Sequence, residues 1–143
     1  MKIKQLSIFV ENKAGRLAKI TNTLAAANID IRAISVADTT EFGILRLIVN
    51  DPERACEHLK KENITVSLTE VIAVGIDDTP GEFAKAMNVL ADNGIAIEYV
   101  YAFISRDRGK AFVILRVDDN DRAVEVFKGA DIEVLTSAQI HGM

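Results

Sequence analysis

The sequence predicts an α+β fold built from two tandem units, each with an antiparallel sheet and two helices on one face of that sheet. One observation is a repeat: the segments 11–31 and 77–97 align without a gap, and each carries a glycine just before an apolar stripe at helical spacing. The other observation is the order of the predicted elements: strand-like and helix-like patterns follow one another in the same order in both halves of the chain. Together they favour a duplicated βαββαβ unit.

The repeat extends over the whole chain. Gly81 follows Gly15 by 66 residues, whereas farther along Asp119 follows Asp51 by 68 residues. The change in spacing places two extra residues in the turn 105–110 of the second copy. Because both spacings persist and the length change falls in a turn, chance similarity is a poor explanation. We therefore expect two homologous domains, residues 1–70 and 71–143.

Four strands are predicted in each copy. These runs are rich in β-branched and aromatic residues, and the first of them partly alternates between apolar and polar residues. A short polar turn separates the second run from the third, which predicts a hairpin. The expected strands are 3–11, 29–38, 42–50 and 64–73 in the first copy and 71–77, 95–104, 110–117 and 131–140 in the second.

Two helices are predicted in each copy. The first spans 15–27 and its repeat spans 81–93, both with apolar residues at helical spacing. The second begins at Asp51 as N-cap with Pro52 at the first helical position, and its repeat spans 120–128. The resulting order of elements is the split βαβ, ferredoxin-like arrangement. Since such a unit leaves one sheet face and its edge strands uncovered, we expect a homodimer.

Composition and charge exclude several classes of protein. A hydrophobic content of 49% in 143 residues is enough for a buried core and excludes a disordered chain. The net charge of −4 gives no cationic surface for nucleic acid. No run approaches the roughly 20 apolar residues that span a bilayer, and no signal peptide is evident. With a single cysteine, Cys56, the sequence predicts a cytoplasmic protein without a membrane partner.

Three polar patterns give no site. Residues 118–121 are acidic, but they lack the glycine and distal glutamate of a calcium loop and stand where a helix must be capped. Cys56 and His58 lie close together without a second pair of metal ligands. The basic segment 106–110 fits a solvated hairpin tip. We therefore expect no metal and no cofactor, and we find no catalytic constellation.

The two glycine loops resemble the ACT domain, a family whose members share the βαββαβ fold. Residues 78–83 follow the family pattern of an acidic residue, any residue, Pro, Gly, any residue and a hydrophobic residue; residues 12–17 have Ala14 in place of the proline. The resemblance covers both halves of the chain. It implies a regulatory protein that binds a free amino acid, without catalytic activity, and that signals to a partner enzyme or regulator of amino-acid metabolism.

Such a loop can hold an α-carboxylate. Its glycine allows close approach to the backbone, and the first-turn amides of the helix lack intrahelical acceptors and favour an anion. Asp30, Asp77 or Asp78 could provide the charge opposite the ammonium of the amino acid. The candidate ligand-binding residues of the loops are Asn12, Ala14, Gly15, Arg16, Leu17, Asp78, Thr79, Pro80, Gly81, Glu82 and Phe83.

The resemblance also implies a second wall, near the start of the second strand of a neighbouring unit. The candidate residues of that wall are Asn28, Ile29 and Asp30, or Asn93, Gly94 and Ile95.

Structural explanations compete with this hypothesis. Residues 79–82 fit a capping box with Pro80 at the first helical position, and Asn12 fits an N-cap of the first copy. Gly15 and Gly81 would then only permit tight packing of helix on sheet. Two further functions therefore stay open: a ligand-free assembly module and, on the same scaffold, a small enzyme.

Overall fold

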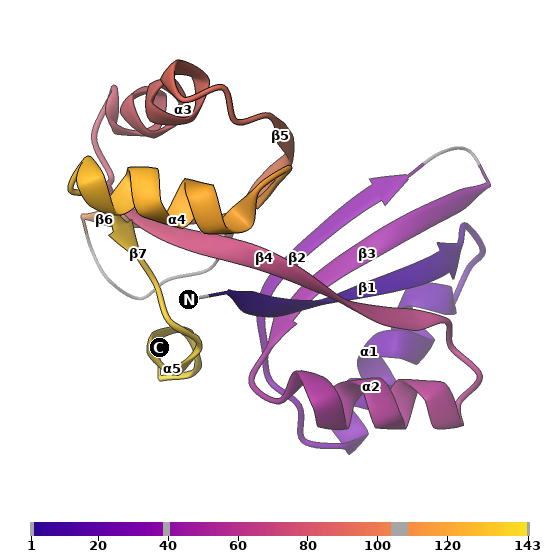
Figure 1. The fold of residues 1–143 in the computed structure, drawn as a ribbon. Helices are drawn as coiled ribbons and strands as arrows, with labels where there is room; N and C mark the ends of the chain where they lie inside the picture. Colours follow the sequence, from indigo (N-terminus) through magenta and orange to yellow (C-terminus); the bar gives the residue numbers. More distant parts are fainter. Residues whose placement is uncertain (1, 39–40, 104–108, 143) are drawn as a thin grey trace. The chain divides into compact units, whose positions relative to one another are not determined.

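The computed structural model describes residues 2–38, 41–103 and 109–142, which form seven strands and five helices (Figure 1). The chain divides into two compact units. The N-terminal unit comprises Lys4–Thr69, and the C-terminal unit comprises Glu70–Met143 together with Met1–Ile3.

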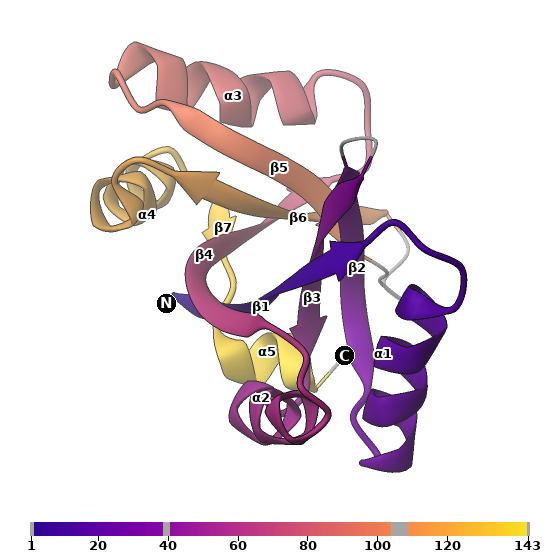
Figure 2. The same ribbon diagram turned by 90° about the vertical axis from the view of Figure 1, so that its right-hand side faces the viewer.

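The N-terminal unit is a sheet with both of its helices on one face, as Figures 1 and 2 show. Its sheet order is β2-β3-β1-β4, the order expected for a ferredoxin-like unit. Its elements are β1 (Ile3–Glu11), α1 (Arg16–Ala26), β2 (Ile31–Asp38), β3 (Phe42–Val49), α2 (Pro52–Lys61) and the first part of β4 (Val66–Asp77).

The C-terminal unit repeats this arrangement with the order β7-β4-β6-β5. Helices α3 and α4 pack against one face of its sheet. Its elements after β4 are α3 (Glu82–Asp92), β5 (Ile97–Phe103), β6 (Lys110–Val117), α4 (Asn120–Gly129), β7 (Glu133–Val134) and α5 (Ser137–His141). The α+β prediction of two tandem ferredoxin-like units is therefore confirmed.

Strand register decides which side chains enter each core. In the N-terminal unit Ile8 lies opposite Leu45, and both are fully buried beneath the helices together with Leu24 of α1 and Leu59 of α2. The next residue along, Phe9, points to the opposite face and is 49% exposed. The period of two along a strand thus separates a helix-covered face from an uncovered one.

The C-terminal core uses the matching positions. Val74 of β4 lies opposite Val113 of β6, and Leu90 of α3 and Phe127 of α4 close over them. The helix starts correspond as well, because Asp51 accepts a hydrogen bond from the amide of Arg54 in one copy and Asp119 from that of Arg122 in the other. The interpretation of residues 118–121 as a helix cap is confirmed.

Two strand predictions need correction. The segments 64–73 and 71–77 form one continuous strand, β4, because no turn residue interrupts the apolar run between them. The predicted strand 131–140 is wrong: β7 has two residues, and a short helix follows. That helix begins because Thr136 and Gln139 form a reciprocal capping box, and it buries Ile140.

The expected hairpins are present as paired strands, β2 with β3 and β5 with β6. Their turns are only partly covered, since residues 39–40 and 104–108 lie outside the described part of the chain. The basic hairpin tip predicted at 106–110 falls largely in that segment.

Candidate ligand-binding site

Both glycine loops adopt the same left-handed backbone conformation. Gly15 has φ of 84° and Gly81 has φ of 93°, and each is the N-cap of the helix that follows, without a side-chain cap. Among the described residues, nothing lies within 4 Å of a Cβ built on either glycine. Glycine is therefore needed for the left-handed backbone, and the explanation by tight packing is wrong.

The capping-box explanation of residues 79–82 is also wrong. Helix α3 begins two residues later than that motif requires, with Gly81 as N-cap, while the carbonyl of Thr79 accepts a turn hydrogen bond from the amide of Glu82 (3.3 Å). Asn12 likewise does not cap α1, whose N-cap is Gly15. Both helices therefore have a glycine as N-cap, and neither helix has a side-chain cap.

The first turns of α1 and α3 present unused hydrogen-bond donors. A helix start leaves several amides without intrahelical acceptors, and here no side chain replaces them. Within the described part of the chain, the N-cap and first-turn amides without a backbone acceptor are those of Gly15, Leu17 and Ala18 at α1 and of Gly81, Phe83 and Ala84 at α3.

A hollow lies beside each loop, at the same place in both units. The N-terminal hollow has a volume of about 120 Å³ and the C-terminal hollow about 400 Å³. Every residue that lines the smaller hollow has its counterpart in the lining of the larger one at the spacing of the sequence repeat, as with Leu17 and Phe83 or Val36 and Ala102. Two independent copies of the fold therefore form a hollow at the same loop.

The polar rims of the two hollows differ in charge. In the N-terminal hollow the Glu11 carboxylate contacts Lys13 Nζ at 3.1 Å and Arg16 at 3.9 Å. Those cations, Lys13 first, hold the pKa of Glu11 below its ordinary value. The surplus charge at this rim is positive.

In the C-terminal hollow Asp77 accepts a hydrogen bond from Lys110 Nζ at 2.8 Å, which lowers the pKa of Asp77 and raises that of Lys110. Asp78 has no cationic partner among the described residues. Glu82 adds a second carboxylate in the first turn of α3. The surplus charge at this rim is negative.

A family model described as ACT domain pair matches residues 1–143 of the chain. The chain belongs to the ACT domain pair family. It also resembles protein BT0572 from Bacteroides thetaiotaomicron, with 38% identity, a TM-score of 0.94 and coverage of 100% of this chain and 98% of that one. No curated protein matches the sequence.

More distant structures share the fold of this ACT pair. The regulatory subunit of aspartate kinase from Thermus thermophilus, in its ligand-free form, has a TM-score of 0.64 at 18% identity and matches 89% of this chain and 91% of its own length. The corresponding subunit from Thermus flavus has a TM-score of 0.61 at 20% identity, with coverage of 89% and 91%. None of the described helices of the ACT pair is long and apolar enough to span a membrane.

The predicted loop residues divide into two groups. Asn12, Leu17, Asp78, Thr79 and Phe83 line the hollows. The others lie in the loops or first turns without lining these hollows: Ala14, Gly15, Arg16, Pro80, Gly81 and Glu82.

The predicted second wall lies at the other end of α1 and α3. Each helix has 11 residues and is therefore about 16 Å long. Asn28 (φ 57°) and Gly94 (φ 67°) follow the helix ends in the left-handed conformation, which confirms their structural role there. A single unit does not bring this wall to its own glycine loop.

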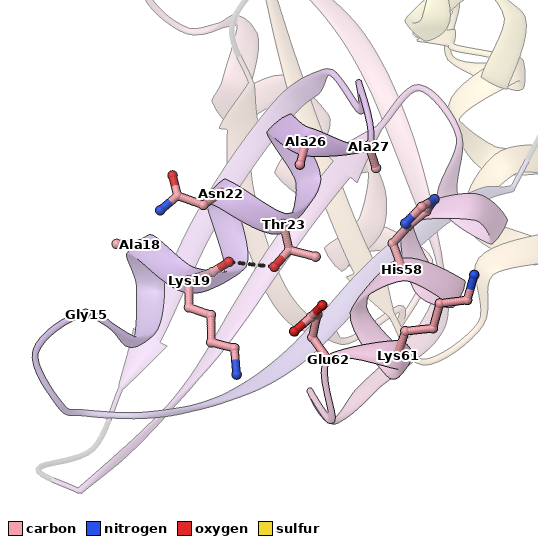
Figure 3. A pocket seen from close by; sticks show the side chains of 10 residues that line it. All are labelled: Gly15, Ala18, Lys19, Asn22, Thr23, Ala26, Ala27, His58, Lys61 and Glu62. Atoms are coloured by element: carbon pink, nitrogen blue, oxygen red, sulfur yellow. Dashed lines mark hydrogen bonds between the residues drawn. The ribbon is translucent and has the colours of Figure 1, made fainter.

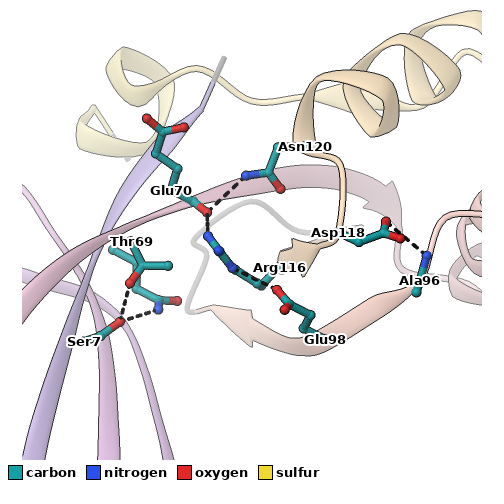
Figure 4. Close-up of polar contacts among 9 residues, drawn as sticks. Ser7, Thr69, Glu70, Ala96, Glu98, Arg116, Asp118 and Asn120 are labelled. Carbon is teal, nitrogen blue, oxygen red and sulfur yellow. Dashed lines mark hydrogen bonds and ion pairs between the residues drawn. The ribbon is translucent and has the colours of Figure 1, made fainter.

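The remaining wall residues are held by the fold. Ile29 and Ile95 are buried in the two cores, and Asn93 is the C-cap of α3. The amide of Asp30 donates to Asn50 Oδ1 at 2.9 Å. At the matching place of the C-terminal unit the amide of Ala96 donates to the Asp118 carboxylate at 3.3 Å (Figure 4).

The sequence-based prediction missed one wall of each hollow. Val36 in the N-terminal unit, and Val100, Tyr101 and Ala102 in the C-terminal unit, come from the end of the second strand of the unit. The alternation of side chains along the strand could have predicted this wall. Val36 pairs with Leu45, a core residue, so the register places Val36 on the helix side of the sheet.

A third hollow of about 620 Å³ lies between α1 and α2 (Figure 3). Charged side chains of both helices surround it, including Lys19, Lys61 and Glu62, and the Thr23 hydroxyl donates to the carbonyl of Lys19 at 2.8 Å. At the position of Thr23 the C-terminal unit has Val89, which packs against the core. Gly15 and Ala18, two of the residues with unused first-turn amides, also line this hollow.

Proposed function

We propose that this ACT pair is a non-catalytic regulatory protein that binds a free amino acid and signals to a partner enzyme or regulator of amino-acid metabolism. The observation that carries the proposal is the pair of equivalent hollows, each beside a glycine loop with unused first-turn amides. A carboxylate is the group that such amides and the helix dipole favour. The match of the whole chain to the ACT domain pair supports it.

Regulation would follow from differential binding. A ligand shifts an equilibrium between two arrangements of domains or chains only if it binds one arrangement better than the other. We propose that residues 1–70 and 71–143 act as the two domains of this switch, and that the walls Asn28–Asp30 and Asn93–Ile95 complete a ligand site from a neighbouring unit. The proposed setting is cytoplasmic, with no cofactor, nucleic acid or membrane as partner.

We further propose a homodimer, as a second role that the uncovered sheet face favours. Phe9 and Phe42 stack with ring centroids 5.0 Å apart on the face opposite the helices, and they are 49% and 42% exposed. Ile44, paired with Phe9, is exposed on the same face. Exposed apolar surface of this kind marks association sites. Sedimentation of wild type and of a Phe9→Lys variant tests it, and a wild-type monomer would refute it.

A thermal-shift screen against the common amino acids, followed by calorimetric titration of each hit, tests the regulatory proposal. At a hundred times its dissociation constant a ligand stabilises the native state by about 2.7 kcal/mol. For a chain of this size that amounts to several degrees in Tm. Absence of any shift with every amino acid would refute the proposal and favour the ligand-free assembly module.

A further inference from the structure

The two hollows are not equally suited to an amino acid. Pockets for small molecules typically have volumes of roughly 300–1,000 Å³. The C-terminal hollow, at about 400 Å³, is within this range, and the N-terminal hollow, at about 120 Å³, is well below it. The difference arises partly at Val36, whose counterpart Ala102 is smaller.

The hollows also differ in their charge toward an ammonium group. A zwitterionic ligand needs donors for its carboxylate and an acceptor of opposite charge for its ammonium. Asp78 lines the C-terminal hollow together with Phe83, whose amide has no backbone acceptor, and no described cation neutralises Asp78. Its counterpart is the uncharged Asn12, and the nearest carboxylate there, Glu11, already pairs with Lys13 and Arg16.

Apart from Thr79 and Tyr101, which carry hydroxyl groups, the remaining walls of the C-terminal hollow are apolar. Phe83 from α3 and Val100 from β5 are 42% and 38% exposed at its edge, while Ile76 and Val113 form its buried side. The neighbouring Asp77 carboxylate is neutralised by Lys110. A charged ligand side chain would therefore lose its hydration without gaining a partner, whereas an apolar one would cover exposed apolar surface.

We propose that the C-terminal hollow is the amino-acid site of this chain, that Asp78 pairs with the ligand ammonium, and that the site selects a large apolar side chain, aliphatic or aromatic. This rests on the proposed regulatory function. The carboxylate binds at the start of α3, where Phe83 lines the hollow and has an unused amide, the ammonium binds Asp78, and the side chain extends toward Val100 and Ala102. The N-terminal hollow binds no amino acid.

Isothermal titration of the full chain tests this inference. The probes are L-phenylalanine, L-leucine, L-lysine, L-glutamate and 3-phenylpropanoate, which has the carboxylate and ring of phenylalanine without its ammonium. We expect phenylalanine or leucine to bind at least about tenfold more tightly than the two charged amino acids, and at least about tenfold more tightly than 3-phenylpropanoate.

Variants locate the site. Asp78→Asn, which installs the amide found in the other copy, should weaken binding about tenfold or more, and Ala102→Trp should fill the hollow and abolish it. Asp92→Asn and Ala91→Trp make the same changes on exposed positions at the far end of α3 and should leave the affinity within twofold. Thermal melts of each variant verify folding.

The outcomes separate this inference from the function beneath it. Tighter binding of lysine or glutamate than of the apolar amino acids would overturn the inference and leave the regulatory function standing. Loss of binding in Val36→Trp but not in Ala102→Trp would do the same, since it would place the ligand in the N-terminal hollow. Failure of every amino acid to bind would instead remove the proposed function itself.

Discussion

Replacing Gly81 by alanine tests the claim that backbone conformation, and not space, requires glycine at this loop. Gly81 has φ of 93°, and among the described residues no atom lies within 4 Å of the Cβ that the substitution would add. Any loss of stability must therefore come from the dihedral angle. Gly129, at the end of α4, has equal space and no positive φ, so Gly129→Ala is the matched control.

The two substitutions should change the free energy of unfolding in opposite directions. Placing an L-residue in the left-handed region destabilises the native state by roughly 1–2 kcal/mol. Alanine also lowers the conformational entropy of the unfolded chain, which stabilises the native state by about 0.4–1 kcal/mol. Gly81→Ala should thus lower the free energy of unfolding by about 1 kcal/mol. Gly129→Ala should raise it by up to about 1 kcal/mol, because alanine is the better helix former.

Urea unfolding followed by circular dichroism measures both variants. With a slope of about 1–3 kcal/mol per molar urea, each change corresponds to a midpoint shift of about 0.5 M, in opposite directions. Gly81→Asn should lose less than Gly81→Ala, because asparagine tolerates the left-handed region better. Equal stabilisation by Gly81→Ala and Gly129→Ala would refute the conformational explanation.

Three further predictions concern the C-terminal unit. Phe127→Ala should lower the free energy of unfolding by about 3–5 kcal/mol in urea titrations, because this ring is fully buried in the core. Thr136→Ala should cost about 0.5–2 kcal/mol by removing the cap of α5, and Thr136→Ser should restore most of it. Lys110 lowers the pKa of Asp77 from 3.8, so their pair stabilises the native state above that pH, and this contribution disappears as the pH falls through the lowered pKa. Urea midpoints of Lys110→Met between pH 2 and 6 should show a smaller acid-side decline than wild type at low salt, and an unchanged decline would contradict the pairing.

Most of the fold was readable from the sequence because duplication supplies two samples of each pattern. The sequence predicts the helices α2 and α4 because their N-caps, Asp51 and Asp119, act through local side-chain chemistry. The end of the chain broke the pattern, because the capping box at Thr136 competes with strand propensity and the helix buries Ile140. The repeat predicts a strand at this point, but the capping box forms and the chain is helical.

The candidate site was less accessible to sequence reasoning. The loops were found because a glycine before a helix has a definite backbone consequence, but the wall formed by Val100 to Ala102 depends on how β5 pairs with β6. Pairing register is a tertiary property, and it places residues about twenty positions beyond the loop into the hollow. The second wall at Asn93–Ile95 lies at the far end of α3, so within one unit it is a helix length away from Gly81.

The two copies have the same backbone conformation at the glycine loops and differ in charge at the hollows. Gly15 and Gly81 keep the left-handed angle in both loops, since the fold needs it twice. At the hollows, in contrast, the N-terminal copy has Asn12 at the position where the C-terminal copy has Asp78. Both residues are exposed, and neither caps a helix. Because neither residue caps a helix, the proposed site offers an explanation of this difference in charge: Asp78 provides a carboxylate for a ligand ammonium, and Asn12 does not.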